Sequence, residues 1–91
     1  MLYAIICIDK PGHLEVRKAN REAHIAHIKG SNGAIVQAGP FLDAAGEMCG
    51  SLLIYEAEDI AEAQAWADAD PYKAADLFQS VEIRPWHRVV G

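Results

Sequence analysis

Three side chains on one predicted helix have the chemistry to bind and deprotonate a small anionic molecule. Arg17, Arg21 and His24 follow one another within residues 13–29, and helical spacing places all three along one side. Guanidinium groups hold carboxylates, phenolates and enolates through charge-assisted hydrogen bonds. Nearby guanidinium charge also favours the neutral imidazole, which is the form that acts as a general base. The alternative for His24 is a half-buried ring bonded to a backbone carbonyl.

Arg21 stands out among them because it falls inside the apolar stripe of that helix. Leu14, Ile25 and Ile28 mark the stripe at about 100° per residue, and the other arginine and the histidine lie along its edge. Long charged side chains are rarely buried unless they are paired or used. The pattern therefore predicts a small cationic, titratable site beneath one helix.

Asp70 and Ser51 are further candidates, each with an ordinary structural alternative. Asp70 directly precedes Pro71, so it fits a helix N-cap as well as a partner for a cationic group. The two roles are compatible, since one carboxylate oxygen can cap while the other orients an imidazole. Ser51 could offer its hydroxyl to a ligand. Because no G-x-S-x-G elbow surrounds it, a nucleophilic role is not expected.

No metal or cofactor is expected. His24 and His27 could share a metal ion, but zinc needs a third and usually a fourth ligand, and no H-E-x-x-H or paired-cysteine pattern is present. Phosphate-loop, dinucleotide and flavin-type motifs are also absent from the sequence. Cys7 and Cys49 have no zinc-type or redox spacing and lie in apolar stretches, which indicates buried thiols.

The elements that must position these residues follow the order β-α-β-β-α-β. Strands are predicted at 2–8, 34–38, 51–56 and 81–90, and helices at 13–29, 60–69 and, more briefly, 71–78. No repeat, linker or low-complexity tract divides the chain, so residues 1–91 are expected to form one domain. The order is typical of the α+β ferredoxin-like fold, in which helices cover one face of the sheet.

Turn and cap residues support these boundaries. Gly30 is placed to cap the first long helix, and the Gly39-Pro40 pair is expected to end the second strand. Asp59 followed by Glu62 resembles a capping box at the start of the second helix. Pro85 assigns the last strand to a sheet edge or a bend.

Both faces of the first strand are apolar, which predicts a homodimer. Alternate positions carry apolar residues in both directions: Leu2, Ala4, Ile6 and Ile8 on one face, and Tyr3, Ile5 and Cys7 on the other. The helices can cover only one face. We therefore expect a second copy of the chain to cover the other face of the sheet by packing sheet on sheet.

Charge and hydropathy restrict the partners and the location. The formal net charge is −5, which argues against nucleic acid because phosphate binding needs a basic face. The apolar run at residues 2–8 is too short to span a bilayer and lacks the features of a signal peptide. A cytoplasmic protein without a membrane partner is therefore expected.

Five short segments, in order along the chain, resemble the YCII-related family of small bacterial proteins. They are R-x-x-H at Arg21 and His24, A-G-P at residues 38–40, G-S at Gly50 and Ser51, W-A-x-x-D-P-Y at residues 66–72 and V-E-I-R-P-W at residues 81–86. The chain lacks the longer insertion that some relatives carry between A-G-P and G-S. That difference leaves the hairpin short.

The resemblance implies a dimeric α+β barrel of ferredoxin-like protomers and an active site in which His24 pairs with Asp70. It also implies kinship with cofactor-free isomerases, lyases and monooxygenases that act on ring compounds. Dehydrochlorination of a chlorinated hydroquinone is an activity associated with the family. The resulting hypothesis is a cofactor-independent lyase or isomerase in which Asp70 orients His24 as the base. Arg21, with Arg17, would hold the anion.

Two alternatives use the same residues. A non-catalytic accessory domain that binds a small metabolite would need the same arginine and histidine. In the second alternative the site has lost its function, and the aliphatic part of Arg21 simply packs on the sheet edge while its guanidinium lies in water. A fold of this kind does not by itself decide the reaction.

Overall fold

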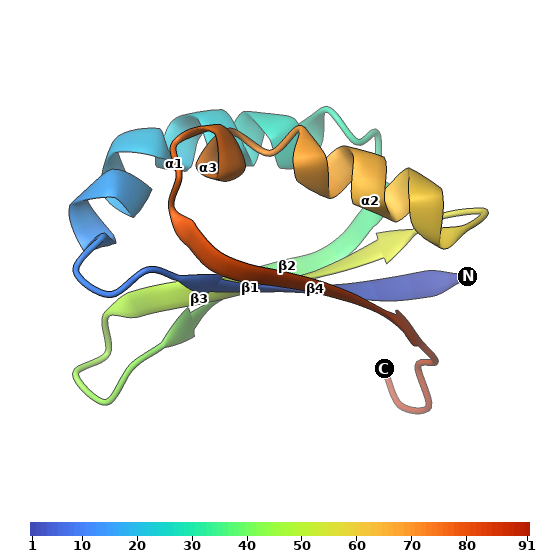
Figure 1. Ribbon diagram of the computed structural model, residues 1–91. Helices are drawn as coiled ribbons and strands as arrows, with labels where there is room; N and C mark the ends of the chain where they lie inside the picture. Colours follow the sequence, from blue (N-terminus) through green and yellow to red (C-terminus); the bar gives the residue numbers. More distant parts are fainter.

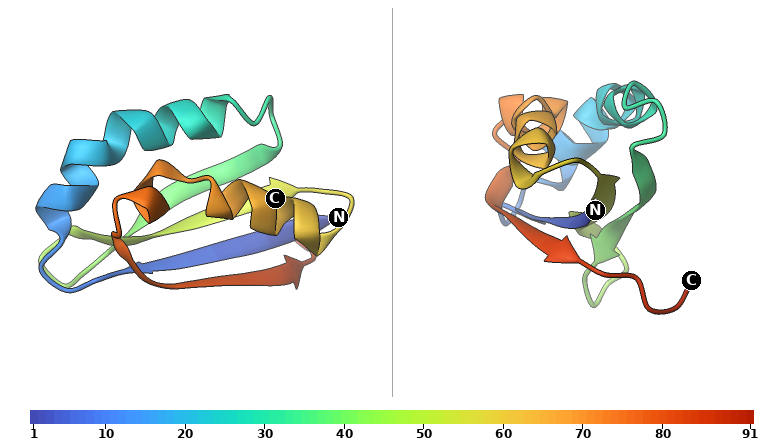
Figure 2. Two further views of the ribbon diagram at one scale, coloured as in Figure 1. Left: turned by 45° about the horizontal axis from the view of Figure 1, so that its top comes forward. Right: turned by 90° about the vertical axis from the view of Figure 1, so that its right-hand side faces the viewer.

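Four strands form one antiparallel sheet that carries every helix on a single face. The computed structural model describes all residues, 1–91. The sheet order is β2-β3-β1-β4, and Figures 1 and 2 show the helices side by side above it. The elements are β1 (Leu2–Asp9), α1 (Leu14–Lys29), β2 (Ile35–Leu42), β3 (Met48–Glu56), α2 (Ile60–Asp68), α3 (Pro71–Ala74) and β4 (Phe78–Trp86). The predicted α+β ferredoxin-like arrangement is confirmed.

The core lies between the sheet and α2, because alternate residues of the two central strands point toward the helices. Its buried members are Tyr3, Ile5 and Cys7 of β1, Leu53, Tyr55 and Ala57 in and after β3, and Ala63, Trp66 and Ala67 of α2. The same alternation carries Asp9 to the helix side at the end of β1, where it is also buried. A carboxylate is thus placed beneath α1.

The two outer strands tolerate proline because each has a free edge. β2 does not end at Gly39-Pro40 as predicted. It continues to Leu42, with Pro40 opposite Ser51 of β3. A proline in an edge strand can direct its missing N–H away from the sheet, so no ladder hydrogen bond is lost. Pro85 lies in β4 at the opposite edge, which confirms the edge position predicted for it.

The helix boundaries follow local backbone chemistry. Asp59 caps α2 by accepting a hydrogen bond from the Glu62 backbone N–H at 3.0 Å, as the capping-box pattern predicts. After α1, Gly30 keeps a right-handed helical conformation, and the left-handed positions belong to Asn32 and Gly33. The third helix is shorter than expected. It ends at Ala74, and Asp76 then turns the chain with a φ of 58°.

The face of the sheet opposite the helices exposes several large apolar side chains. Ile8, Leu52 and Trp86 are 41%, 37% and 38% exposed, although each lies in a strand. Figure 1 shows only the β2–β3 turn and the C-terminal tail on that side. None of the helices has the length and apolar character needed to cross a membrane.

Candidate functional site: a cationic pocket beneath α1

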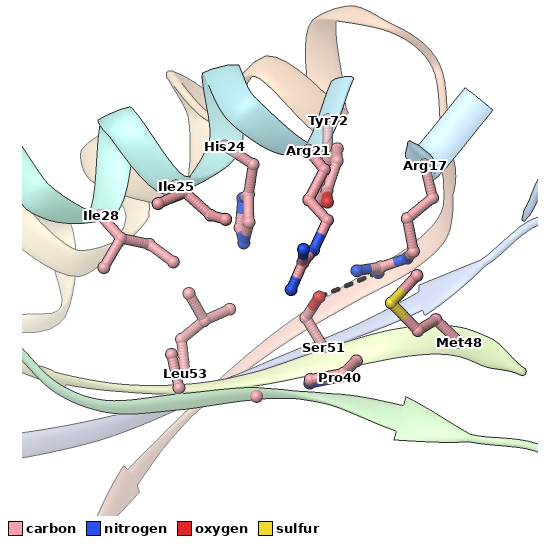
Figure 3. Close-up of a pocket in the computed structure, with 12 residues that line it drawn as sticks. Arg17, Arg21, His24, Ile25, Ile28, Pro40, Met48, Ser51, Leu53 and Tyr72 are labelled. Carbon is pink, nitrogen blue, oxygen red and sulfur yellow. Dashed lines mark hydrogen bonds between the residues drawn. The ribbon is translucent and has the colours of Figure 1, made fainter. Parts of the chain in front are cut away.

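A pocket of about 150 Å³ opens between α1 and the strands β2 and β3. Figure 3 shows its two ends. Arg17, Arg21 and Ser51 lie toward the N-terminal end of α1, and Ile25 and Ile28 lie toward the other end. The remaining lining residues are His24, Ala38, Gly39, Pro40, Met48, Leu53 and Tyr72. The pocket thus offers positive charge at one end and an apolar wall at the other.

The buried arginine is Arg17, and the expectation that Arg21 lies buried in the stripe is wrong. Arg17 is 2% exposed, whereas Arg21 is exposed and projects into the open side of the pocket. The physical reason is that α1 packs against α3 and stands away from β2 and β3. Leu14, Ile25 and Ile28 are consequently only half-buried. The Arg21 guanidinium lines the pocket and makes no hydrogen bond or ion pair within the chain.

Most N–H donors of the Arg17 guanidinium form hydrogen bonds within the chain. Its Nε donates to Asp9 Oδ2 at 2.6 Å, and its Nη2 donates to Asp9 Oδ1 and to Ser51 Oγ, both at 2.9 Å. Burial alone would lower the pKa of Arg17, but the hydrogen bond and the charge of Asp9 outweigh it and raise that pKa. Nη1 has no protein partner. Ser51 accepts from Arg17 and keeps its own O–H available.

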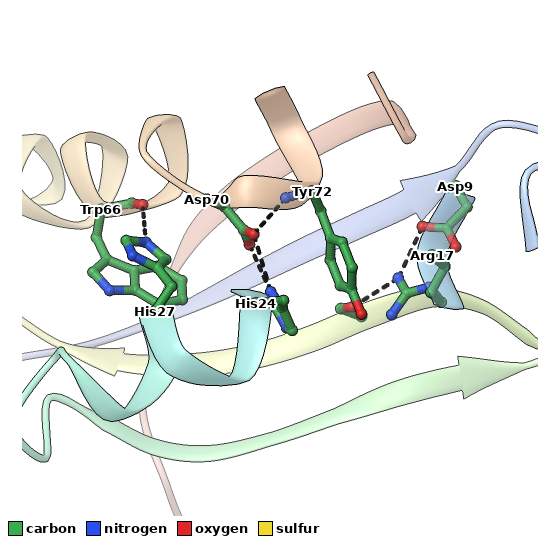
Figure 4. Close-up of polar contacts among 8 residues, drawn as sticks. Asp9, Arg17, His24, His27, Trp66, Asp70 and Tyr72 are labelled. Atoms are coloured by element: carbon green, nitrogen blue, oxygen red, sulfur yellow. Dashed lines mark hydrogen bonds and ion pairs between the residues drawn. The ribbon is translucent and has the colours of Figure 1, made fainter. Parts of the chain in front are cut away.

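His24 and Asp70 meet across the helix layer although they are 46 residues apart. His24 Nδ1 lies 3.0 Å from Asp70 Oδ1 and 3.1 Å from Oδ2 (Figure 4). Because a carboxylate only accepts, Nδ1 carries the hydrogen and Nε2 holds a free lone pair on the pocket side. Asp70 Oδ1 also accepts from the Tyr72 backbone N–H at 2.9 Å, so the carboxylate caps α3 and holds the imidazole at once.

Tyr72 fills the space between the two buried pairs. Its ring stacks on His24 with centroids 4.1 Å apart and an interplanar angle of 17°. The Arg17 guanidinium lies 4.6 Å from the Tyr72 ring centroid, on the other side in Figure 4. Stacked and cation–π contacts of this kind fix the ring orientation. The His24 imidazole is therefore held both at its edge and on one face.

The environment of the Cys7 thiol opposes its ionisation. Burial, together with the charges of Asp70 and Asp9, raises the pKa of Cys7 to about 12, and Arg17 offsets only part of this. Both cysteines are free, with Cys7 buried and Cys49 half-buried. The expectation of a buried thiol is confirmed for Cys7.

His27 lies away from the pocket and faces α2. Its Nε2 donates to the Trp66 backbone carbonyl at 2.9 Å, and its ring stacks on the indole. His24 and His27 thus bond to different partners. Across the chain, no three His, Cys, Asp or Glu side chains come together in a group that could hold a metal ion.

Sequence reasoning missed two members of the site, Asp9 and Tyr72. Asp9 continues the alternation of Tyr3, Ile5 and Cys7, so its burial on the helix side was readable from the strand pattern. Tyr72 carries no such signal. Only the turn that places α3 beside α1 brings its ring against His24.

Comparisons with known proteins agree with the fold. A family model described as the YCII-related domain matches residues 1–87. Protein YciI of Escherichia coli O6:H1 is 40% identical, over 98% of this chain and 99% of that protein. The 5-chloro-2-hydroxyhydroquinone dehydrochlorinase TftG of Burkholderia phenoliruptrix AC1100, solved in complex with 2,5-dihydroxybenzoquinone, superposes with a TM-score of 0.89 and 36% identity. The superposition covers 96% of this chain and 94% of TftG.

More distant structures share the fold alone. A NIPSNAP family protein from Agrobacterium tumefaciens strain C58 has a TM-score of 0.55 and 22% identity, with 91% of this chain and 87% of that one covered. At that identity the likeness concerns the backbone arrangement.

Proposed function

The chain belongs to the family of YCII-related domains, and from that premise we propose that it is a cofactor-independent enzyme of the lyase or isomerase type. Its substrate would be a small anionic or aromatic molecule bound in the pocket beneath α1. The observation that carries this proposal is the arrangement of His24, whose Nδ1 is held by Asp70 while Nε2 faces the pocket. An imidazole oriented in this way is suited to general base catalysis.

In the proposed reaction His24 Nε2 takes a proton from an acidic carbon or a phenol of the ligand. Asp70 fixes the tautomer and stabilises the imidazolium that forms. The electron pair of the broken bond moves toward a ligand oxygen, where Arg21 balances the developing negative charge and Arg17 and Ser51 line the same end. If that pair then expels a leaving group, the result is an elimination. If the proton returns to another atom, the result is an isomerisation.

The size of the pocket supports a ligand of one ring. Apolar cavities of about 150 Å³ accommodate benzene, and the pocket here has about that volume. TftG, at 36% identity, is a dehydrochlorinase that was solved with a single-ring quinone. A dehydrochlorinase-like reaction on a hydroxylated ring is therefore the first activity to test.

The two histidines of α1 supply the test and its control. Turnover of hydroxylated and chlorinated single-ring compounds is measured for the unchanged protein, for His24→Gln and for His27→Gln. Loss of a general base is expected to lower kcat by about 100- to 10,000-fold in His24→Gln. His27→Gln should keep its rate because His27 faces α2. Equal rates in the unchanged protein and His24→Gln would show that the base is assigned wrongly.

A non-catalytic domain that binds a small anionic metabolite is the second candidate, because Arg21 is free in the pocket. The pH dependence separates the two. A neutral imidazole base predicts a rate that increases with pH through one ionisation. A binding domain predicts affinity for an anion that improves as pH falls and His24 gains charge.

We also propose that the open face of the sheet packs against a second copy to form a homodimer, in the cytoplasm. The support is the exposure of large apolar side chains on that face, including Ile8 and Trp86. Large apolar side chains exposed together on one face of a sheet mark an interaction surface. A monomeric mass by light scattering at micromolar concentration would refute the dimer.

A further inference from the structure

We propose that Tyr72 is a substrate-binding residue whose hydroxyl donates a hydrogen bond to the ligand oxygen that Arg21 also contacts. Nothing in the sequence motifs assigns it this role. The inference rests on the ligand site proposed above, but it concerns binding and is independent of turnover. Tyr72, Arg21 and His24 would then hold three sides of one small molecule.

The first support is that the Tyr72 ring cannot easily turn away. His24 stacks on it at 4.1 Å, Arg17 lies 4.6 Å from its centroid, and Phe78 meets its edge at 6.0 Å and 83°. The residue is only 1% exposed. A side chain clamped on both faces and at one edge presents its hydroxyl in a fixed position, which reduces the entropy lost on binding.

The second support is the hydroxyl itself. Buried tyrosines normally find a hydrogen-bond partner for the O–H, but Tyr72 Oη makes no hydrogen bond within the chain. Tyr72 lines the pocket together with Arg21, and Figure 3 shows its oxygen pointing from the helix layer toward the sheet. Trp66 Nε1 is the only fully buried side-chain polar atom without a partner, so Tyr72 Oη is accessible from the pocket. An accessible, unpaired hydroxyl on a clamped ring can form a hydrogen bond with a molecule that enters the cavity.

The hydroxyl also stays protonated, so it can donate. Burial raises the pKa of Tyr72, Arg17 and Arg21 lower it, Asp70 and Asp9 raise it again, and the net shift is upward. Tyr72 therefore remains a neutral phenol at physiological pH. The neutral Tyr72 hydroxyl would donate a hydrogen bond to the ligand oxygen, and the Arg21 guanidinium would supply the positive charge.

The stacking restricts the ligand class. The His24 and Tyr72 rings lie face to face with centroids 4.1 Å apart. His24 Nε2 and the Tyr72 hydroxyl can therefore contact neighbouring atoms of one ligand. A ligand that meets both needs an oxygen anion beside the atom that carries the acidic proton. Phenols with a second oxygen on the neighbouring ring carbon have this arrangement, and so do vinylogous acids such as 2,5-dihydroxybenzoquinone.

The test is a calorimetric titration with 2,5-dihydroxybenzoquinone at neutral pH. The proteins are the unchanged chain, Tyr72→Phe and Tyr55→Phe. Phenylalanine keeps the ring between His24 and Arg17 and removes only the hydroxyl. Tyr55 is buried against Trp66 outside the pocket and provides the matched control. Tyr72→Phe is expected to weaken binding about tenfold or more, as for a lost hydrogen bond to an anion. Tyr55→Phe should bind as the unchanged protein does.

Three results would overturn the inference. They are equal affinity in Tyr72→Phe and the unchanged protein, an equal loss in Tyr55→Phe, and no binding by the unchanged protein up to millimolar ligand. Failure of the proposed function gives a different pattern, because binding would still depend on Tyr72 while no compound was turned over. Thermal unfolding of each variant checks that a change in affinity reflects the hydroxyl and not the fold.

Discussion

Two histidines on the same helix, three residues apart, have nearly the same surroundings and different chemistry. His24 stacks on Tyr72 at 4.1 Å and His27 on Trp66 at 4.2 Å, both with an interplanar angle of 17°. Each makes hydrogen bonds to one neighbour. His24 uses Nδ1 toward a carboxylate, and His27 uses Nε2 toward a backbone carbonyl. Only His24 lines the pocket.

Burial and stacking therefore do not distinguish the proposed base, His24, from His27. What matters is which nitrogen remains free and what it faces. At His24 the free atom is Nε2, directed to a cavity. At His27 the free nitrogen is Nδ1, and neither His27 nor Trp66, on which it stacks, lines the pocket. A negative partner also stabilises a protonated imidazole, which a carbonyl does less well.

The largest expected effect on the difference between His24 and His27 comes from removing the Asp70 carboxylate. Asp70→Asn keeps an oxygen for the Tyr72 backbone N–H, but its amide group can donate to His24 Nδ1 and move the hydrogen to Nε2. We expect kcat/KM to fall by about 100- to 10,000-fold on any compound that the unchanged protein turns over. Asp68→Asn, two residues away and bonded to Lys73 and Gln64, is the matched control. Equal losses in both variants would contradict the pairing.

The second pair on α1 should matter for stability instead. Arg17→Met leaves Asp9 buried without its bidentate partner, and breaking a buried ion pair costs about 3–5 kcal/mol. Urea unfolding followed by circular dichroism measures this loss. The double variant Arg17→Met/Asp9→Leu should recover most of it, because the uncompensated charge is gone. A single variant as stable as the unchanged protein would show that the pair is not structural.

The smallest expected effect concerns the Cys7 thiol beneath the pair. Its pKa is about 12, raised from 9.0 chiefly by burial and then by Asp70. The unfolded chain releases this proton near 9.0 and the folded chain does not, so the contribution to stability is complete below pH 9 and lost as pH rises toward 12. At pH 8.5, iodoacetamide should modify Cys49 and leave Cys7 intact by mass spectrometry. Similar rates at both thiols would contradict the buried position.

The sequence predicted most of the fold because its signals are local. Alternation in β1, the Asp59 cap and the edge prolines each depend on neighbouring residues, and the order of elements follows from them. Strand ends depend on more than local signals, as the extension of β2 through Pro40 illustrates. A proline ends a central strand but not an edge strand, and edge position is a property of the whole sheet.

The site was harder to predict because tertiary packing forms it. The apolar stripe of α1 pointed to Arg21 as the buried cation, but the gap between α1 and the outer strands left Arg21 exposed and buried Arg17. The pairing of His24 with Asp70 was inferred from family resemblance, since 46 residues separate them and no local spacing joins them. Tyr72 ends the W-A-x-x-D-P-Y segment of the resemblance, but nothing in the sequence predicted that its ring would lie against His24.

The central claim is that Asp70 holds His24 with Nε2 unprotonated and free. Long-range ¹H–¹⁵N correlation NMR of the free protein at pH 8 measures it directly, because the nitrogen shifts distinguish the two neutral tautomers. We expect the Nδ1–H tautomer for His24 and the Nε2–H tautomer for His27 in the same spectrum. An Nε2–H tautomer at His24 would contradict the account.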